Sequence, residues 1–282
     1  MNKYLVDDIY FSYNYDLDER FNKNLSKYKT KNNNTPNHSI KVIVKDNIEN
    51  SLNKTKSYSY KDDFNITHIY TISNNNITSH ITHDNKYQNI YINVNKSVIK
   101  DLNRAVYILS GIMFLEIAIY NNYFPLHATS ITLNNKTYLI SAPSGTGKST
   151  IRKNFLKLYN ATIINDDKPL LKFINNEVYV VGSPFSGEDM INDNMNTKLS
   201  GIIFLNRGSN NKLESINKKD FINLLIKNTY RTKSKDAFNQ MIKHTELLVD
   251  NIPAMKFYAT KDTSAAKHLY NKLYKGVENL CK

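Results

Sequence analysis

One short segment near the middle of the chain constrains its fold most. Two of the eight glycines in the 282-residue sequence lie in it, and it consists of Ser144, Gly145, Thr146, Gly147, Lys148, Ser149 and Thr150. An apolar, strand-like stretch at 137–140 precedes it, and a helix-like stretch at 151–158 follows. A strand, a glycine-rich turn and a helix in this order are typical of a phosphate-binding loop, in which main-chain N–H groups and the helix N-terminus face phosphate oxygens. The sequence therefore predicts a site for nucleotide phosphates in an α/β fold.

The side chains of this segment fit the same chemistry. Lys148 can reach the β- and γ-phosphates, and the hydroxyl of Ser149 can ligate Mg²⁺. Ala142 stands where the motif usually has its first glycine, so the strict pattern is missed by one methyl group. The alternative is a glycine-rich turn that binds nothing. The strand before the loop and the helix after it favour the nucleotide interpretation.

The net charge of +13 raises the question of nucleic-acid binding. Most of the excess is lysine, whereas recognition of bases and phosphates by paired hydrogen bonds prefers arginine. The chain has few arginines, namely Arg20, Arg104, Arg152, Arg207 and Arg231. A general bias toward lysine and asparagine explains the charge as well, so we expect no specific nucleic-acid partner.

The compartment is expected to be reducing and cytoplasmic. Cys281 is the single cysteine, which excludes an intrachain disulfide, and it is too isolated to form a metal site. The first residues contain no apolar region of the kind found in signal peptides. The most apolar run, 105–119, contains Glu116 and is shorter than the roughly 20 residues of a membrane span, so a buried core helix and no membrane are expected.

The pattern along the chain predicts two regions, a β-rich region at 1–97 and an α/β region at 98–282. Alternating apolar and polar residues predict N-terminal strands at 41–44, 66–72 and 87–94. Many of the twenty tyrosines lie there, and we expect them to pack on the sheet rather than to stack on bases. Further helices are expected at 97–121 (with Ser97 as the cap), 218–228, 236–249 and 264–280, and strands at 128–133, 137–141, 162–165, 178–181, 199–205 and 255–259.

Two adjacent carboxylates, Asp166 and Asp167, follow the expected strand at 162–165. Carboxylates at a strand end beside a nucleotide can hold Mg²⁺ and can accept a proton from an attacking hydroxyl. Both tasks belong to phosphoryl transfer, although a solvated acidic turn is the alternative. His127 precedes the strand pair that leads to the loop, where it could contact a γ-phosphate or tune a carboxylate. The segment 182–188, with its glycines and proline, is either part of the ligand edge or an ordinary turn.

These residues resemble a known family when they are taken in order. Leu126-His127-Ala128, the segment from Ser141 to Thr150, and Asn165-Asp166-Asp167 look like the catalytic core of the HPr kinase/phosphorylase family. That family is itself similar to phosphoenolpyruvate carboxykinases. Pro184, Phe185 and Gly187, with the strand at 203–205, further resemble the HPr-kinase-like proteins of modified-peptide pathways, which include lasso-peptide kinases. The resemblance implies a P-loop kinase core behind a β-rich N-terminal region.

The resemblance implies a role for each matching residue. Lys148 and the N–H groups of residues 144–149 would bind the phosphates of ATP. Ser149 would ligate Mg²⁺ with the help of Asp167, and Asp166 would be the general base, although the two acids are hard to rank. His127 would lie near the transferred phosphate. Arg207 or Arg231 could offset charge that develops on the γ-phosphoryl group, although no motif fixes either.

The departures from the family shape the expected activity. We find neither the long N-terminal domain of true HPr kinases nor the arginine-glycine signature of their reverse reaction. The sequence therefore favours an ATP- and Mg²⁺-dependent kinase acting on a serine or threonine hydroxyl of a small protein or precursor peptide. A small-molecule kinase with the same core and a nucleotide-binding regulatory module remain alternatives. A homo-oligomer is possible, but the sequence does not determine the oligomeric state.

Overall fold

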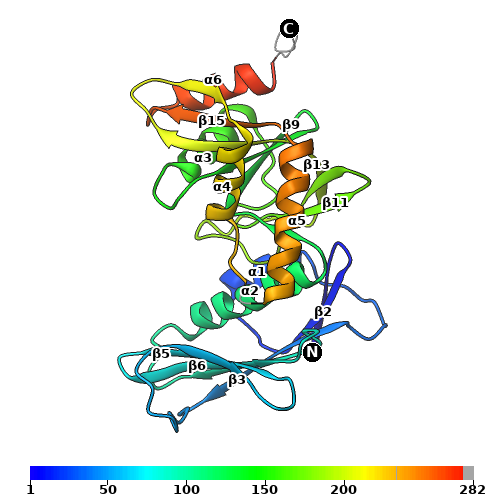
Figure 1. The fold of residues 1–282 in the computed structure, drawn as a ribbon, viewed down its shortest axis with the longest axis vertical. Coiled ribbons are helices and arrows are strands. Elements are labelled where there is room, and N and C mark those ends of the chain that lie inside the picture. The colour runs from blue at the N-terminus through cyan, green and yellow to red at the C-terminus, as the bar shows by residue number, and fades with distance from the viewer. Residues whose placement is uncertain (233, 276–282) are drawn as a thin grey trace. The chain divides into compact units, whose positions relative to one another are not determined.

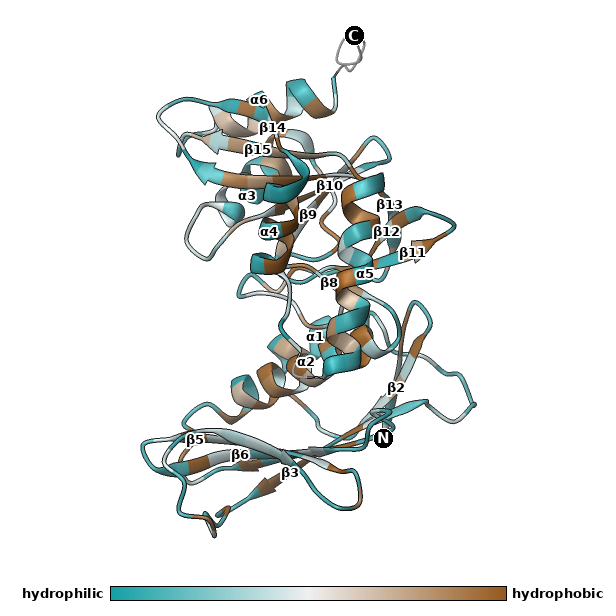
Figure 2. Ribbon diagram, viewed as in Figure 1, coloured by the Kyte–Doolittle hydropathy of each residue, from teal (hydrophilic) through white to brown (hydrophobic). Residues whose placement is uncertain are grey.

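The computed structural model describes residues 1–232 and 234–275 (Figure 1). The chain forms two compact units, Met1–Asn121 and Asn122–Lys282. Each unit contains a mixed β-sheet with helices, so the expected α/β class is confirmed at this level. In Figure 2 hydrophobic residues lie on both helices and strands, whereas the connecting loops are mainly hydrophilic.

A seven-stranded sheet forms the first unit, with the strand order β1-β2-β3-β7-β6-β5-β4. β3 lies parallel to both β2 and β7, and the other neighbours are antiparallel. The strands are β1 (Asn2–Val6), β2 (Ile9–Tyr13), β3 (His38–Lys45), β4 (Tyr58–Lys61), β5 (Thr67–Ser73), β6 (Asn76–His83) and β7 (Asn89–Asn95). A short helix, α1 (Glu19–Ser26), follows β2.

The long helix α2 (Leu102–Tyr120) packs on β3 and β7 of this sheet. Asp101 caps it by accepting a hydrogen bond from the main-chain N–H of Arg104 at 3.0 Å, so the expected cap at Ser97 is wrong. The hydroxyl of Ser97 donates instead to the carbonyl of Asp46 in a neighbouring loop. By contacts the helix groups with the N-terminal sheet, whereas the sequence-based division at residue 97 placed it with the second region. As a division into functional domains, that boundary stays a prediction.

Helix α2 is the one helix among residues 1–232 and 234–275 that is long and apolar enough to cross a membrane, judged by length and composition alone. Within its most apolar window, 61% of the residues are buried inside the structure. A buried core helix of a soluble protein meets the same criteria, so this finding is weak evidence for a span. The expected absence of a membrane partner stays a prediction.

The second unit contains an eight-stranded mixed sheet in which β10, β13 and β15 run parallel to one another. The first residues of the long strand β13 pair with β12, and the remainder of β13 lies between β10 and β15. The strands are β8 (Phe124–Pro125), β9 (Ala128–Leu133), β10 (Lys136–Ser141), β11 (Leu170–Ile174), β12 (Glu177–Val181), β13 (Asn196–Arg207), β14 (Lys212–Ser215) and β15 (Ala254–Ala259). The helices are α3 (Lys148–Tyr159), α4 (Lys218–Asn228), α5 (Lys235–Asn251) and α6 (Ser264–Leu273).

The β9–β10 hairpin delivers the glycine-rich segment to its place. Asn134 and Asn135 have φ values of 51° and 59°, as a two-residue turn between antiparallel strands requires. The predicted hairpin is therefore confirmed. α3 contacts both β9 and α6, and apolar side chains of the sheet and of α3, such as Ile140 and Phe155, share one core. The loop between β10 and α3 is thus fixed at both of its ends.

The expected strand at 162–165 is wrong, because this segment forms only isolated bridges. It runs beside β9, but the hydroxyl of Ser130 accepts hydrogen bonds from the N–H groups of Ile164 and Asn165, which a strand would use for its ladder. The side-chain amide of Asn165 donates to the carbonyls of Ser183 and Phe185. Side-chain hydrogen bonds thus interrupt the main-chain ladder before the two acids, although the N–H groups of Ser130 and Ala128 still donate to the carbonyls of Asn165 and Asp167. The terminal helix is confirmed as far as Leu273; residues 276–280 of that prediction, and Cys281, lie outside the described residues.

Candidate functional site

The loop between β10 and α3 has the backbone that the glycine-rich segment predicts. Gly145 and Gly147 have φ values of +75° and +120°, a region that residues with a side chain rarely adopt. A Cβ at Gly147 would have its nearest neighbour, Leu205, at 3.9 Å, so the backbone conformation and not the space requires glycine. Gly147 also caps α3 without a side-chain hydrogen bond. The N–H groups of the first helical turn are therefore left without a side-chain cap, which suits an anion.

Ala142 is buried, whereas Ser144, Gly145, Ser149 and Thr150 are exposed. The residues expected to face phosphates therefore lie at the surface. Thr146 donates its hydroxyl to the carbonyl of Pro143 at 2.9 Å, which closes the turn on itself.

Lys148 lies at the first position of α3 and points back over the loop. Its Nζ donates to the carbonyl of Ala142 at 2.6 Å. Burial lowers the pKa of Lys148, while the negative charge of Asp167 acts in the opposite direction. Lys148 and Asp167 are thus close enough for their charges to interact, as a site that joins the loop to the acids requires.

Asp167 is held by two basic side chains. His127 Nε2 lies 3.2 Å from Asp167 Oδ1, and Lys168 forms an ion pair with Oδ2. Burial raises the pKa of Asp167, but the hydrogen bond with His127 and the charge of Lys168 outweigh it, so the pKa lies well below the usual range of an aspartate. The side chain keeps 24% of its surface exposed. Asp167 is therefore an ionised carboxylate that solvent, or a substrate, can reach.

Asp166 has different surroundings although it is the next residue along the chain. Its side chain is 1% exposed. Oδ2 lies 3.1 Å from Arg152 Nη1, and Oδ1 accepts the main-chain N–H of Gly187 at 2.7 Å. Burial raises the pKa of Asp166 above its usual range, against the effects of Gly187 and Arg152. Both of its oxygens are thus used inside the protein.

Arg152 is a residue of the site that the sequence reasoning missed. Its guanidinium, 3% exposed, bridges Asp166 and Asp189. One signal was available, since Arg152 follows Lys148 by four residues and therefore shares its face of α3. The segment 182–188, in contrast, was considered, and Gly187 of that segment contacts both acids.

The two arginines considered for charge stabilisation lie in different places. Arg207, at the end of β13, donates from Nη2 to the carbonyl of Gly145 in the loop at 2.6 Å. Arg231 lines a cavity of 320 Å³ beside His127. The cavity is lined by Pro125, His127, Lys168, Lys227, Asn228, Thr229, Tyr230 and Arg231. The second unit therefore has cationic side chains on the loop and in the cavity next to Asp167.

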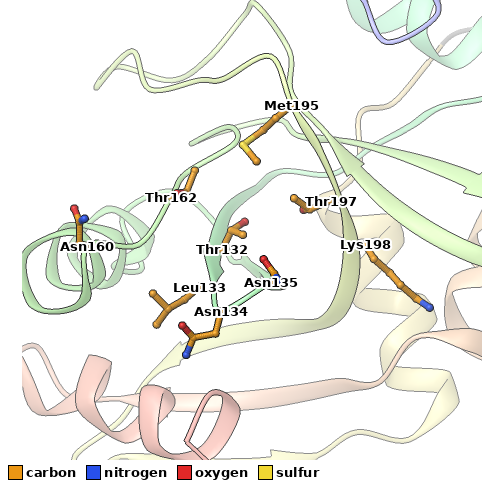
Figure 3. A pocket seen from close by; sticks show the side chains of 9 residues that line it. All are labelled: Thr132, Leu133, Asn134, Asn135, Asn160, Thr162, Met195, Thr197 and Lys198. Carbon is orange, nitrogen blue, oxygen red and sulfur yellow. The ribbon is translucent and has the colours of Figure 1, made fainter.

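A larger hollow of 510 Å³ lies at the other end of β10, around the Asn134–Asn135 turn (Figure 3). Its lining consists of Thr132, Leu133, Asn134, Asn135, Asn160, Thr162, Met195, Thr197 and Lys198. Lys198 is the one charged residue in this lining, and it is paired with Glu177. None of the residues expected to act in catalysis lines this hollow.

The residues near the loop fit a magnesium ion held together with phosphates. Among residues 1–232 and 234–275, no group of three or more His, Cys, Asp or Glu side chains could hold a metal ion by itself. Mg²⁺ in nucleotide sites needs no such group, since it is usually bound through one or two carboxylates, waters and the phosphates. The hydroxyl of Ser149 and the ionised carboxylate of Asp167 are oxygen ligands of this kind.

Comparison with known proteins identifies no family. No family model matches the chain, and no curated protein matches it. Among solved structures, the chain is similar to the Hpr(Ser) kinase/phosphatase from Coxiella burnetii. The match has 13% sequence identity and a TM-score of 0.29, and it covers 54% of this chain and 99% of the other. A likeness at this score supports no statement about activity, which has to be argued from the site.

Proposed function

We propose that the protein is a kinase that transfers the γ-phosphoryl group of ATP to a serine or threonine hydroxyl of a small protein or precursor peptide. The observation that carries the proposal is the geometry of Asp167, a partly exposed acid held by His127 at 3.2 Å and by Lys168, in the same unit as the glycine-rich loop and Lys148. Phosphoryl transfer needs a phosphate cradle, cationic groups and an acid that orients the acceptor, and little else from the protein.

The loop supplies the phosphate cradle in this proposal. The N–H groups of residues 144–149 bind the phosphate oxygens, and Lys148 exchanges the carbonyl of Ala142 for a phosphate. Ser149 ligates Mg²⁺, which neutralises charge on the phosphates when it is bound. Arg207 lies on the same loop and stabilises charge there.

We assign proton acceptance and Mg²⁺ ligation to Asp167, and a positioning role to Asp166. The bond between the acceptor oxygen and the γ-phosphorus forms as the bond to the β,γ-bridging oxygen breaks, ADP leaves, and the hydroxyl proton passes to the carboxylate. Ligation of Mg²⁺ and acceptance of the proton both require an ionised, accessible carboxylate, which fits Asp167. Asp166 is buried between Arg152 and Gly187, so it fits the task of holding the site together. This reverses the sequence-based preference for Asp166 as the base.

The test compares Asp167→Asn with Asp166→Asn. We expect Asp167→Asn to lower the rate of phosphoryl transfer by about 10²–10⁴-fold while ATP still binds, since the loop is unchanged. Mass spectrometry of candidate acceptor peptides incubated with ATP measures the transfer, and calorimetry measures ATP binding. Asp166→Asn should act mainly through folding stability, which urea denaturation measures.

Full activity of Asp167→Asn, with loss of activity in a folded Asp166→Asn protein, would restore the opposite assignment. Binding of ATP without transfer to any peptide or metabolite would favour the regulatory module. An absence of ATP binding would refute the proposed function altogether.

A further inference from the structure

The 320 Å³ cavity adjoins Asp167 directly. His127 and Lys168 line the cavity, and both of them contact the carboxylate of Asp167. A group that enters the cavity therefore lies next to the acid to which we assign the acceptor hydroxyl. This makes the cavity the natural place for the part of the acceptor that flanks this hydroxyl.

Two further cations line the cavity, and neither is neutralised within it. Lys227 lies in the last turn of α4, and Arg231 lies in the loop that follows; both are exposed. Among the described residues, no carboxylate lies within ion-pair distance of either. Other lysines of this region are paired, as Lys218 is with Asp250 and Lys256 with Asp220. The cavity lining thus contains several cationic side chains and no carboxylate; outside the lining, the charge of Lys227 acts on Asp220, and Lys168 is paired with Asp167.

The end of α4 and the loop after it, which carry these cations, are hydrogen-bonded to the segment that carries His127. The carbonyl of Asn228 accepts the main-chain N–H of His127 at 2.8 Å. The hydroxyl of Thr229 donates to the carbonyl of Pro125 at 2.7 Å. Main-chain and side-chain bonds therefore hold the base of the cavity in register with His127, so the charges lie at a defined place and not on a free tail.

We infer that the acceptor is acidic, with a carboxylate or phosphate group on a residue that neighbours the phosphorylated hydroxyl. This inference rests on the proposed function. The guanidinium of Arg231 suits paired hydrogen bonds to either oxyanion, and the ammonium of Lys227 adds a second charge. The cavity has the volume of one or two side chains. It therefore fits an anionic side chain of a peptide better than the extended backbone of a nucleic acid, for which a long basic stripe is typical.

The test measures the binding of synthetic peptides, so it does not depend on transfer. Three fluorescein-labelled peptides share a central serine and differ in its neighbours, which are glutamates, glutamines or phosphoserines. Fluorescence anisotropy with the full chain should give about tenfold tighter binding of the glutamate and phosphoserine peptides than of the glutamine peptide, because charge-assisted hydrogen bonds form only with the anions. Comparison of the two anionic peptides identifies which oxyanion is preferred.

Two variants assign the effect to the cavity. The double variant Lys227→Ala, Arg231→Ala should reduce the preference for anionic peptides to less than about twofold, since the charges are gone. Lys219→Ala is the matched control, because Lys219 is an exposed lysine near the other end of the same helix and is absent from the cavity lining. It should keep the full preference.

The outcomes separate this inference from the proposed function. Equal binding of the three peptides, no binding of any of them, or a preference that survives the double variant would overturn the acidic acceptor. So would tighter binding of a single-stranded oligonucleotide than of the peptides, if the double variant abolished it. A protein that binds no ATP but prefers the anionic peptides through Lys227 and Arg231 would refute the kinase and retain an anion-binding cavity.

Discussion

The two ends of β10 carry hollows of opposite character. At the end that leads into α3 lie the glycine-rich loop, the two acids and a cavity of 320 Å³ lined by His127, Lys168, Lys227 and Arg231. At the hairpin end lies the larger hollow of 510 Å³, lined by amides, hydroxyls and one neutralised lysine (Figure 3). Size would select the hairpin end. The cationic lining and the shifted pKa of Asp167 instead indicate that the loop end is the functional site, because catalytic groups often have shifted pKa values.

The backbone differs between these two ends in an instructive way. Both ends contain pairs of residues with positive φ, Asn134 and Asn135 at the hairpin and Gly145 and Gly147 at the loop. Asparagine adopts this conformation while it keeps a side chain, which is sufficient for a turn. Glycine leaves the main-chain N–H groups open to a ligand. Positive φ values are thus supplied by asparagine at the hairpin and by glycine at the loop, where a ligand would need access to the backbone.

The largest expected difference between the two ends is in catalysis. Lys148→Ala removes the cation of the loop and should lower the rate of phosphoryl transfer by about 10²–10³-fold, as does the loss of one electrostatic contact in other active sites. Lys198→Ala, the matched change at the hairpin end, should leave the rate within about twofold of the unmodified protein. Steady-state kinetics with ATP and an acceptor peptide provide the measurement. Equal losses of rate in Lys148→Ala and Lys198→Ala would contradict the assignment of catalysis to the loop end.

The next difference concerns folding stability. Arg152→Met leaves Asp166 buried without its cation and should lower the free energy of unfolding by about 3–5 kcal/mol. The exposed pair of Lys198 with Glu177 is solvated and screened, so Lys198→Met should cause no measurable change. Urea denaturation of both variants measures these effects. A small loss in Arg152→Met would mean that Asp189, and not Asp166, is the important partner of the arginine.

The smallest difference is in the pH dependence of stability. Because the pKa of Asp167 is depressed in the folded state, its stabilising contribution is present above the unfolded-state pKa of about 3.9 and is lost as the pH falls toward the folded-state pKa. Between pH of about 6 and 3, the unmodified protein should lose about 1–2 kcal/mol more than Asp167→Asn. Asp166, with its raised pKa, has the opposite sign, and because the charge of Asp167 contributes to that rise, Asp167→Asn reduces it. Glu177→Gln, at the hairpin end, should change the pH profile much less, because the pair with Lys198 that lowers the pKa of Glu177 is exposed to solvent. Parallel profiles for Asp167→Asn and the unmodified protein would contradict the depressed pKa of Asp167.

Local signals explain what the sequence predicted correctly. The Asn134–Asn135 turn, the glycine-rich loop and the apolar core of β13 depend mainly on residues close together in the chain, and all of them are present in the structure. Helix α1 was missed because it is short and mostly polar, with Phe21 and Leu25 as its buried apolar residues, although its cap at Asp18 is a regular one. The roles of the site residues stay predictions, since they concern ligands.

Contacts between distant segments explain what the sequence could not predict. Nothing in Asp166-Asp167 indicates which acid is buried. That depends on Arg152 from α3 and on Gly187 from a loop that is 20 residues further along the chain than Asp167. Likewise, Ser130 and Asn165 are ordinary strand residues by pattern, but their side chains interrupt the ladder next to the acids. Lys227 and Arg231 meet His127 only because α4 ends beside the start of β9.

Gly187 has a consequence for how the acids are kept in place. A Cβ at this position would lie 3.1 Å from the Cβ of Asp167 and 3.2 Å from Oδ1 of Asp166, so no larger residue fits unless the carboxylates shift. The loop that carries Gly187 is therefore packed so closely on the two acids that a side chain at position 187 requires either the loop or the acids to shift. Gly187 thus bears on the position of the two acids through the side chain that it lacks and through its main-chain N–H.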